Sequence, residues 1–124
     1  MEQVQQVLTE VMRIRGALGA VVVDYLSRVT LGVQGNGTEL DLHKVGEVDT
    51  DVIRAKFHAL SVLGYPPGDL QDILVTLTDE YHLIHPLSQR KLQGVFIYLV
   101  LDRNSAALAV ARARLREIEE AFDL

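Results

Sequence analysis

The residues best suited to chemistry in this sequence are its four histidines, which could bind a metal ion or transfer protons. His82 and His85 lie at positions i and i+3 of a stretch that is expected to be extended, so their side chains should point to opposite faces of a strand. They therefore cannot hold one metal ion together. His43 and His58 lie about four turns apart on an expected helix. This spacing favours ordinary surface or half-buried histidines, and no metal or other cofactor is expected.

The sequence also lacks the patterns of covalent catalysis and phosphate binding. No serine lies in a Gly-x-Ser-x-Gly turn, and the Gly-Asn-Gly stretch at residues 35–37 is not followed by the lysine of a phosphate-binding loop. There is no cysteine, which excludes a disulfide framework and a thiolate metal site. Because no convergent set of titratable residues can be assembled, we expect no enzymatic activity.

Composition narrows the class of protein further. The 124 residues suffice for one globular domain, residues 1–124. The net charge of −5 argues against nucleic-acid binding, which depends on clustered Lys and Arg. No apolar run approaches the ~20 residues of a membrane span. We therefore expect neither a nucleic-acid nor a membrane partner, and the lack of cysteine fits a cytoplasmic location.

One long helix, predicted over residues 38–64, organises the chain. Thr38 is the expected N-cap, Asp41 could return the capping-box hydrogen bond, and Gly64 before two prolines should end the helix. Gly46 should weaken it by up to about 1 kcal/mol relative to alanine. At ~100° per residue, one apolar stripe is expected to face the protein core. This stripe consists of Leu42, Val45, Ile53, Phe57, Leu60 and Leu63.

A second stripe of small apolar residues lies beside the first. It consists of Val48, Val52, Ala55, Ala59 and Val62. The two stripes together cover roughly 220° of the helix, well above the ~100° that packing on one sheet requires. Small residues at alternating spacings allow two helices to approach closely, so we expect the same helix of a second subunit to cover this stripe. The alternative is another helix of the same chain.

The third face of this helix is polar, and two interpretations of it stay open. Lys44, Asp51, Arg54 and His58 could form a patch that a protein partner contacts. The same residues could equally be a solvated helix face.

The remaining periodicities predict the fold class. A short amphipathic helix is expected over residues 2–14, and a last helix should begin after a cap at Asp102 or Asn104. Strands are expected over residues 17–24, 28–34, 69–77, 81–87 and 95–102. Of these, 95–102 is the most apolar and should be central, whereas Pro86 should end its strand. The order α-β-β-α-β-β-β-α indicates an α+β domain, a five-stranded antiparallel sheet with helices on both faces.

This order resembles the Roadblock/LC7 family, the dynein light-chain and MglB-like regulators, which have a profilin-like architecture. The matching stretches are GALGAVVVD, DILVTLTDEYHLIHPL and VFIYLVLDRNSAALAVARARLREIEE, and the resemblance covers nearly the whole chain. The second stretch, and LVLDRNSAALAVAR within the third, are especially similar to small stand-alone bacterial members. One departure is the first hairpin, where the family often has Asp-Gly and this chain has Tyr25-Leu26-Ser27, which leaves the shape of that turn open.

The resemblance implies a dimer whose middle helices lie side by side and whose third strands pair into one continuous sheet. Carried onto this sequence, it places the strand pairing on Leu70, Asp72, Leu74 and Thr76, beside the helix stripe described above. It further implies a non-enzymatic scaffold that binds a small Ras-like GTPase and acts by positioning the GTPase's own residues.

The first functional hypothesis is therefore a cytoplasmic homodimeric regulator or scaffold for a small Ras-like GTPase. The second is a small-ligand sensor of similar build, which should show a sizeable cavity lined by a few convergent polar groups. The large apolar side chains of the predicted strands argue against such a cavity.

Overall fold

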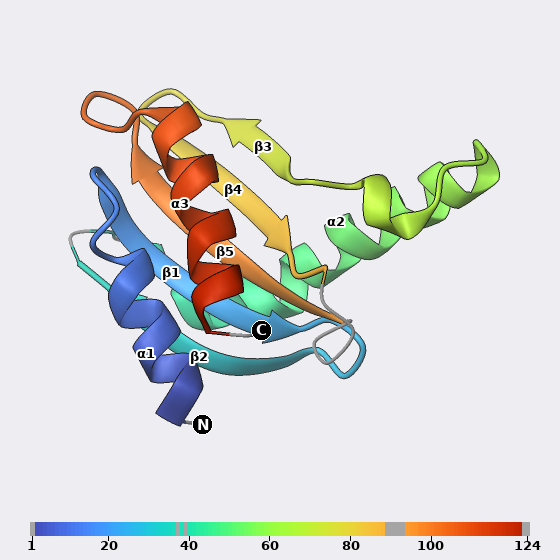
Figure 1. Ribbon diagram of the computed structural model, residues 1–124, viewed down its shortest axis with the longest axis horizontal. Helices are drawn as coiled ribbons and strands as arrows, with labels where there is room; N and C mark the ends of the chain where they lie inside the picture. Colours follow the sequence, from blue (N-terminus) through green and yellow to red (C-terminus); the bar gives the residue numbers. More distant parts are fainter. Residues whose placement is uncertain (1, 37, 39, 89–93, 123–124) are drawn as a thin grey trace.

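The computed structural model describes residues 2–36, 38, 40–88 and 94–122. Along this part of the chain, helices and strands follow the predicted order, with an added 3-10 turn after the long helix (Figure 1). The elements are α1 (Glu2–Val11), β1 (Ala17–Asp24), β2 (Val29–Gly35), α2 (Leu42–Val62), η1 (Pro67–Asp69), β3 (Ile73–Thr76), β4 (Glu80–Pro86), β5 (Val95–Asp102) and α3 (Leu108–Ala121).

The strands form one antiparallel five-stranded sheet in the order β2-β1-β5-β4-β3. β5 is central and buried from Val95 to Leu101, as its uninterrupted apolar run predicts. β3 lies at an edge and pairs only with β4, from Ile73 opposite Ile84 to Thr76 opposite Tyr81. The predicted fold class is confirmed.

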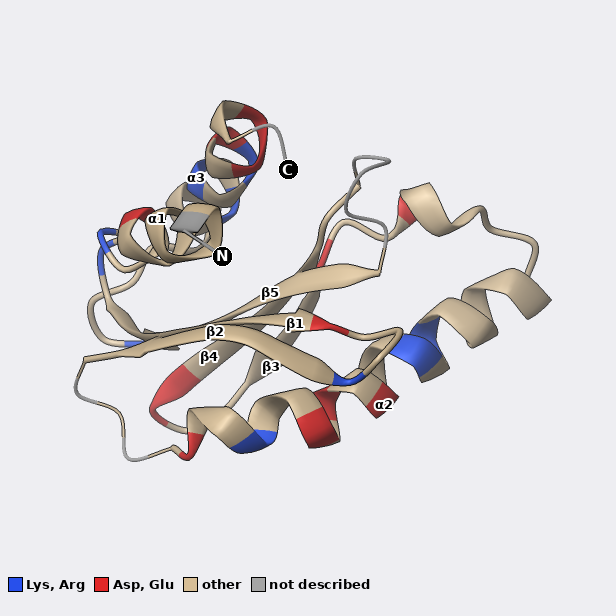
Figure 2. Cartoon of the chain, turned by 90° about the horizontal axis from the view of Figure 1, so that it is seen from below, with Lys and Arg blue, Asp and Glu red and all other residues tan. Residues whose placement is uncertain are grey.

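Helices cover both faces of this sheet. α1 and α3 lie side by side on one face, and α2 runs along the other (Figures 1 and 2). Leu8, Leu99 and Leu115 belong to the apolar core between the sheet and α1 and α3. Ile53 and Phe96 belong to the second core, between the sheet and α2. No helix in the described ranges is both long and apolar enough to cross a bilayer.

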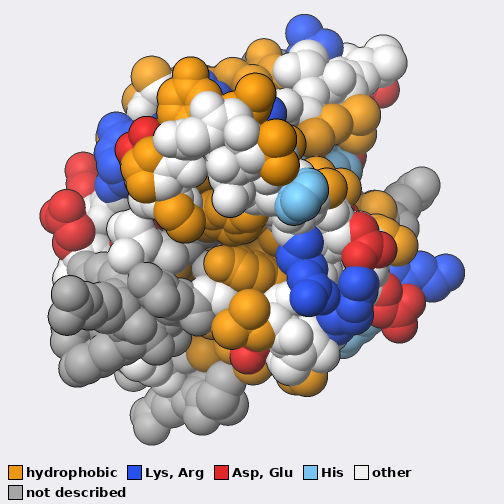
Figure 3. All heavy atoms as spheres, turned by 90° about the vertical axis from the view of Figure 1, so that its right-hand side faces the viewer, with side chains coloured by type: hydrophobic (Ala, Val, Ile, Leu, Met, Phe, Trp, Pro, Cys, Tyr) orange, Lys and Arg blue, Asp and Glu red, His pale blue; other side chains and the backbone are white. Residues whose placement is uncertain are grey.

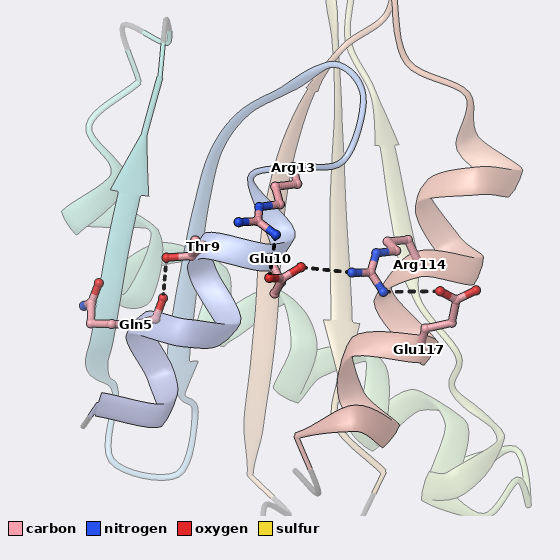
Figure 4. Close-up of polar contacts among 6 residues, drawn as sticks. All are labelled: Gln5, Thr9, Glu10, Arg13, Arg114 and Glu117. Carbon is pink, nitrogen blue, oxygen red and sulfur yellow. Dashed lines mark hydrogen bonds and ion pairs between the residues drawn. The ribbon is translucent and has the colours of Figure 1, made fainter.

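One ion pair joins α1 to α3 at the surface, and two local pairs flank it. Arg114 Nη2 contacts Glu10 Oε2 at 3.0 Å, and the same guanidinium contacts Glu117 at 3.2 Å (Figure 4). Glu10 also accepts from Arg13 at 3.0 Å. Each pair is partly exposed, so it should contribute less to stability than the apolar side chains buried below it.

The observed helix starts correct two predictions. α2 begins at Leu42 rather than Thr38, because Asp41 is the cap and its carboxylate accepts from the His43 backbone N–H at 3.1 Å. Similarly, α3 begins after Ala107, which offers no side-chain cap. Asp102 instead accepts from the Asn104 backbone N–H and the Ser105 hydroxyl, both at 3.1 Å, and so orders the preceding turn. In addition, α1 ends at Val11, short of the predicted residue 14.

Two further predictions are wrong around the end of α2. Leu63 was expected to face the core but is 68% exposed, because α2 extends beyond the sheet (Figure 1). Leu60 is only half-buried for the same reason. The third strand is also shorter than predicted, because Pro67–Asp69 form the 3-10 turn and regular pairing starts at Ile73.

Candidate functional site

The projecting part of α2 is the main feature that its own chain leaves uncovered. Ile53 is the last residue of α2 that is fully buried, and Phe57 is half-buried beyond it. The helix then continues past the strand ends, and the chain returns through η1 to the edge strand β3 (Figures 1 and 2). A free helix end with apolar side chains is expected to find a partner surface.

The second stripe of α2 is exposed along most of its length. Val48, Val52 and Val62 are 59%, 42% and 73% exposed, respectively. Ala55 is also exposed and Ala59 is half-buried. Within the described ranges, no second helix of the same chain lies over this stripe, which was the alternative to a second subunit.

The four residues expected at a strand–strand contact lie in different environments. Leu74 packs against the core below α3, and Leu70 is half-buried beside a surface hollow. The carboxylate of Asp72 turns toward α3 and binds Arg112. Thr76 is exposed. Because β3 is an edge strand, its backbone can still pair with another strand, whereas the side chain of Asp72 is already engaged within its own chain.

The polar face of α2 contains all four residues of the expected partner patch. Lys44, Asp51, Arg54 and His58 are exposed on the same helix. Arg28, which the sequence did not single out, lies over this face. Its guanidinium hydrogen-bonds to Asp51 and donates to the Glu47 carbonyl at 3.2 Å. The hydrogen bond from Arg28 lowers the pKa of Asp51.

Arg28 also accounts for the hairpin that lacks glycine. Asp24 Oδ1 accepts from the backbone N–H groups of Leu26 and Ser27 at 2.9 and 3.3 Å. Arg28 then adopts a left-handed conformation, with φ of 65°, which glycine adopts most readily. The Arg28 contacts with α2 hold this turn in place.

The histidine rings on β4 point to opposite faces of the sheet, as the alternation predicted. His82 contacts the Tyr98 hydroxyl at 2.5 Å and Glu80 at 3.0 Å, on the α2 side. His85 contacts Glu119 of α3 at 3.0 Å. Both rings are buried, contrary to the expected surface or half-buried positions. Among the described residues, no group of three or more His, Cys, Asp or Glu side chains is arranged to hold a metal.

Glu119 is the centre of a partly buried polar cluster that the sequence did not reveal. It accepts from His85 Nε2 at 3.0 Å and from the Ser88 backbone N–H and hydroxyl at 3.1 and 2.8 Å. Burial alone would raise the pKa of Glu119, but these hydrogen bonds outweigh it and lower the pKa. Because the Ser88 hydroxyl donates to Glu119 rather than to His85, the cluster is not a nucleophile–base pair.

A hollow of about 470 Å³ lies where α2 leaves the sheet. Its walls come from the β1–β2 turn, the middle of α2, η1 and the end of β4, and most of the lining is apolar. Figure 3 looks onto this side of the molecule, where apolar side chains gather around a depression with basic side chains on one border. The expectation that large strand side chains would leave no sizeable cavity is not met, because the hollow lies beyond the strand ends.

Sequence comparisons place this chain in no family. No protein-family model matches it, and no curated protein matches it either.

Solved structures, in contrast, are similar over nearly the whole chain. MglB from Myxococcus xanthus matches with a TM-score of 0.81 at 12% identity, over 96% of this chain and 84% of that chain. The gliding protein MglB from Thermus thermophilus matches with a TM-score of 0.79 at 18% identity, over 98% and 86% of the two chains. A Roadblock/LC7 domain from Streptomyces avermitilis matches with a TM-score of 0.74 at 10% identity, over 94% and 91%. The chain therefore has the Roadblock/LC7 fold.

Proposed function

We propose that this protein is a non-enzymatic homodimeric regulator or scaffold that binds a small Ras-like GTPase in the cytoplasm. The uncovered stripe on α2 is the observation that supports the dimer. Its exposed valines and alanines lie at helical spacing, so a partner helix packed along them would remove this apolar surface from water. The edge strand β3 and the residue that follows it add a second surface of the same kind, with Val75 and Leu77 36% and 41% exposed.

The stripe is nearly symmetric about its middle, which supports a two-fold contact. Val48 and Val62 lie seven positions before and after Ala55. Two antiparallel copies that cross at Ala55 would place the small residues at the crossing and each Val48 against the partner's Val62. Such a contact uses the same patch on both subunits, as two-fold dimers do.

The GTPase partner rests on the family resemblance together with the polar face of α2. Lys44, Arg54 and His58 are exposed there, and Arg28 holds Asp51 in position beside them. Arg54 and His58 lie beside the stripe rather than on it, so a dimer would leave them accessible, whereas Lys44 lies one turn before Val48. We infer that the GTPase contacts this face and that neither a nucleic acid nor a membrane is a partner.

The test has two stages, so that its two parts can fail separately. Sedimentation of the purified chain at micromolar concentration should give a dimer, and the A55E/A59E variant should give a folded monomer or insoluble protein. The wild-type chain is then titrated with each purified Ras-like GTPase of the same organism, loaded with GDP or with a GTP analogue. A monomeric wild type contradicts the dimer, whereas a dimer that binds none of these GTPases contradicts only the partner.

A ligand sensor is the second candidate, because the hollow beside α2 is the kind of feature that such a protein needs. A sensor would bind a small molecule without any GTPase.

A further inference from the structure

The hollow beside α2 has the size and composition of a small-molecule site. Its volume of about 470 Å³ lies within the roughly 300–1,000 Å³ that is typical of ligand pockets. Pockets of this kind combine mostly apolar walls with a few polar groups that orient the ligand. Here Arg54 is the only charged side chain in the described lining.

Aromatic contacts fix one wall of the hollow. The Tyr25 ring lies between Phe57 of α2 and Phe96 of β5, with centroid distances of 5.8 and 6.2 Å. The Tyr25 backbone N–H donates to the Gly94 carbonyl at 2.7 Å. Leu26 packs directly over Gly94, where an added Cβ would lie 2.6 Å from Leu26 Cδ1. The wall is therefore formed before any ligand arrives.

Arg54 gives the hollow its charge preference. One turn earlier on α2, Asp51 is already bound by Arg28, and Arg54 forms no ion pair with a described carboxylate. A guanidinium beside an apolar wall has a partly unmet capacity to bind an anion, and carboxylates match its geometry. The site should therefore bind a ligand that has a negative group attached to an apolar body.

A smaller neighbouring hollow limits where that negative group can sit. It holds about 230 Å³ and shares Gly68, Leu70, Pro86 and Ser88 with the first. Its lining includes Arg116 but also the carboxylates of Glu119 and Glu120. Because Glu119 is ionised and buried there, an anion is disfavoured on that side. Among the side chains that the structure describes, Arg54 is therefore the one that can hold the charge of a ligand, with its apolar body between α2 and η1.

We propose that this hollow binds a small amphipathic carboxylate, with its apolar body between Tyr25, Phe57 and Leu70 and its carboxylate on Arg54. The hollow opens at the surface of the molecule (Figure 3), so the affinity for a simple probe is modest. For a ligand of about 12 non-hydrogen atoms, Kd is expected on the order of 1 mM. This binding does not depend on the proposed GTPase, although Arg54 lies on both surfaces. Leu70 was also expected at the strand contact between subunits, so the ligand and the dimer are compatible only if that contact uses the backbone and leaves the Leu70 side chain in the hollow.

The test compares two probes that differ only in charge, 4-phenylbutyrate and 4-phenylbutyramide. In an NMR titration of the full chain, the carboxylate should shift resonances of Tyr25, Phe57 and Gly94 and bind about fivefold or more tightly than the amide. Arg54→Gln should abolish that difference by weakening only the carboxylate. Leu26→Ala removes part of the apolar wall at an exposed residue and should weaken both probes alike.

Arg15→Gln is the matched control, since it removes one exposed arginine from a turn that does not line the hollow. It should bind both probes as the wild type does. Shifts confined to the α2 stripe from Val48 to Val62 would overturn the proposal, because the probes would then only coat the exposed apolar surface. Equal binding of the two probes, or an Arg54→Gln variant that keeps the preference for the carboxylate, would overturn it as well.

Discussion

Arg112 of α3 forms a two-pronged ion pair with Asp72, the residue before β3. Its Nε donates to Oδ2 at 2.8 Å and its Nη2 donates to Oδ1 at 3.1 Å. Paired, nearly parallel hydrogen bonds of this kind are the strongest arrangement between these two groups. The pair ties the edge strand to the helix above it, close to the point where regular pairing with β4 begins.

Breaking this pair should weaken the fold measurably but not severely. We expect Arg112→Gln and Asp72→Asn each to lower the free energy of unfolding by about 1 kcal/mol, since the pair is only partly exposed and well aligned. The double variant should lose little more than either single variant, because both remove one interaction. Urea denaturation at one fixed protein concentration measures all three.

Arg116→Gln is the control for this cycle, because Arg116 is exposed one turn further along α3. It should leave the unfolding midpoint nearly unchanged. If the losses of the two single variants instead add up in the double variant, Arg112 and Asp72 act independently and the pair does not hold β3.

Glu119 should make stability depend on pH in a defined direction. The hydrogen bonds from His85 and Ser88 outweigh burial, so the pKa of Glu119 is lower in the folded chain than in the unfolded one. Its contribution is then complete above the unfolded value of about 4.3 and is lost as the pH falls through the lower folded value. Glu119→Gln should therefore cost about 1–3 kcal/mol at pH 7.

The check is the pH profile of the difference between wild type and variant. Denaturation at pH 7 should show the full loss of unfolding free energy in the variant. The unfolding free energies of the two proteins should converge as the pH falls toward 3. Glu120→Gln alters the adjacent exposed carboxylate and should follow the wild type throughout. A loss that stays constant down to pH 3 would mean that the shape of the side chain matters rather than its charge.

Local periodicity was sufficient to predict the five strands, their order along the chain and the central place of β5. β1 and β5 begin and end where their apolar runs do, because strands buried on both faces need apolar residues at every position. The exposed second stripe of α2 was also visible in the sequence, since it depends only on helical spacing.

Contacts between distant residues could not be predicted in the same way. His85 and Glu119 are 34 positions apart, and Arg28 and Asp51 are 23 positions apart. Which acid meets which base depends on how helices and turns pack. The start of α3 was missed for a related reason, because the Asp102 carboxylate has several possible N–H and O–H donors nearby and binds those of the turn.

Replacing Gly46 with alanine should lower the free energy of unfolding, whereas helix propensity alone predicts that it would raise it. It is buried in α2 against β2, and an added Cβ would lie 2.5 Å from Thr30 Oγ1 and 3.5 Å from Val23. Gly46→Ala should therefore destabilise the chain by about 1–3 kcal/mol, although alanine favours a helix by up to about 1 kcal/mol.

Removing the nearest atom should reverse this effect. In a Thr30→Ala background, the same Gly46→Ala change should be neutral or stabilising, because Thr30 Oγ1 is gone and the helix gains alanine. Thermal unfolding of the four proteins completes the cycle. If Gly46→Ala lowers stability equally in both backgrounds, the added Cβ clashes with an atom other than Thr30 Oγ1.

The contact proposed between two copies of α2 can be tested by cross-linking, since the chain contains no cysteine of its own. If the stripe crosses its partner at Ala55, the two copies of an Ala55→Cys variant lie opposite each other near the two-fold axis. A disulfide requires Cα atoms about 4.4–6.8 Å apart, a distance that two helices reach only where small residues meet. Mild oxidation should then convert most of the protein to a covalent dimer, visible on a non-reducing gel.

Ser61→Cys is the control, because it places an exposed thiol on the polar face of the same helix, and it should stay monomeric on that gel. Equal cross-linking of both variants would indicate random collision. Cross-linking of Ser61→Cys alone would turn α2 by about a third of a revolution in the dimer and move the contact to the polar face.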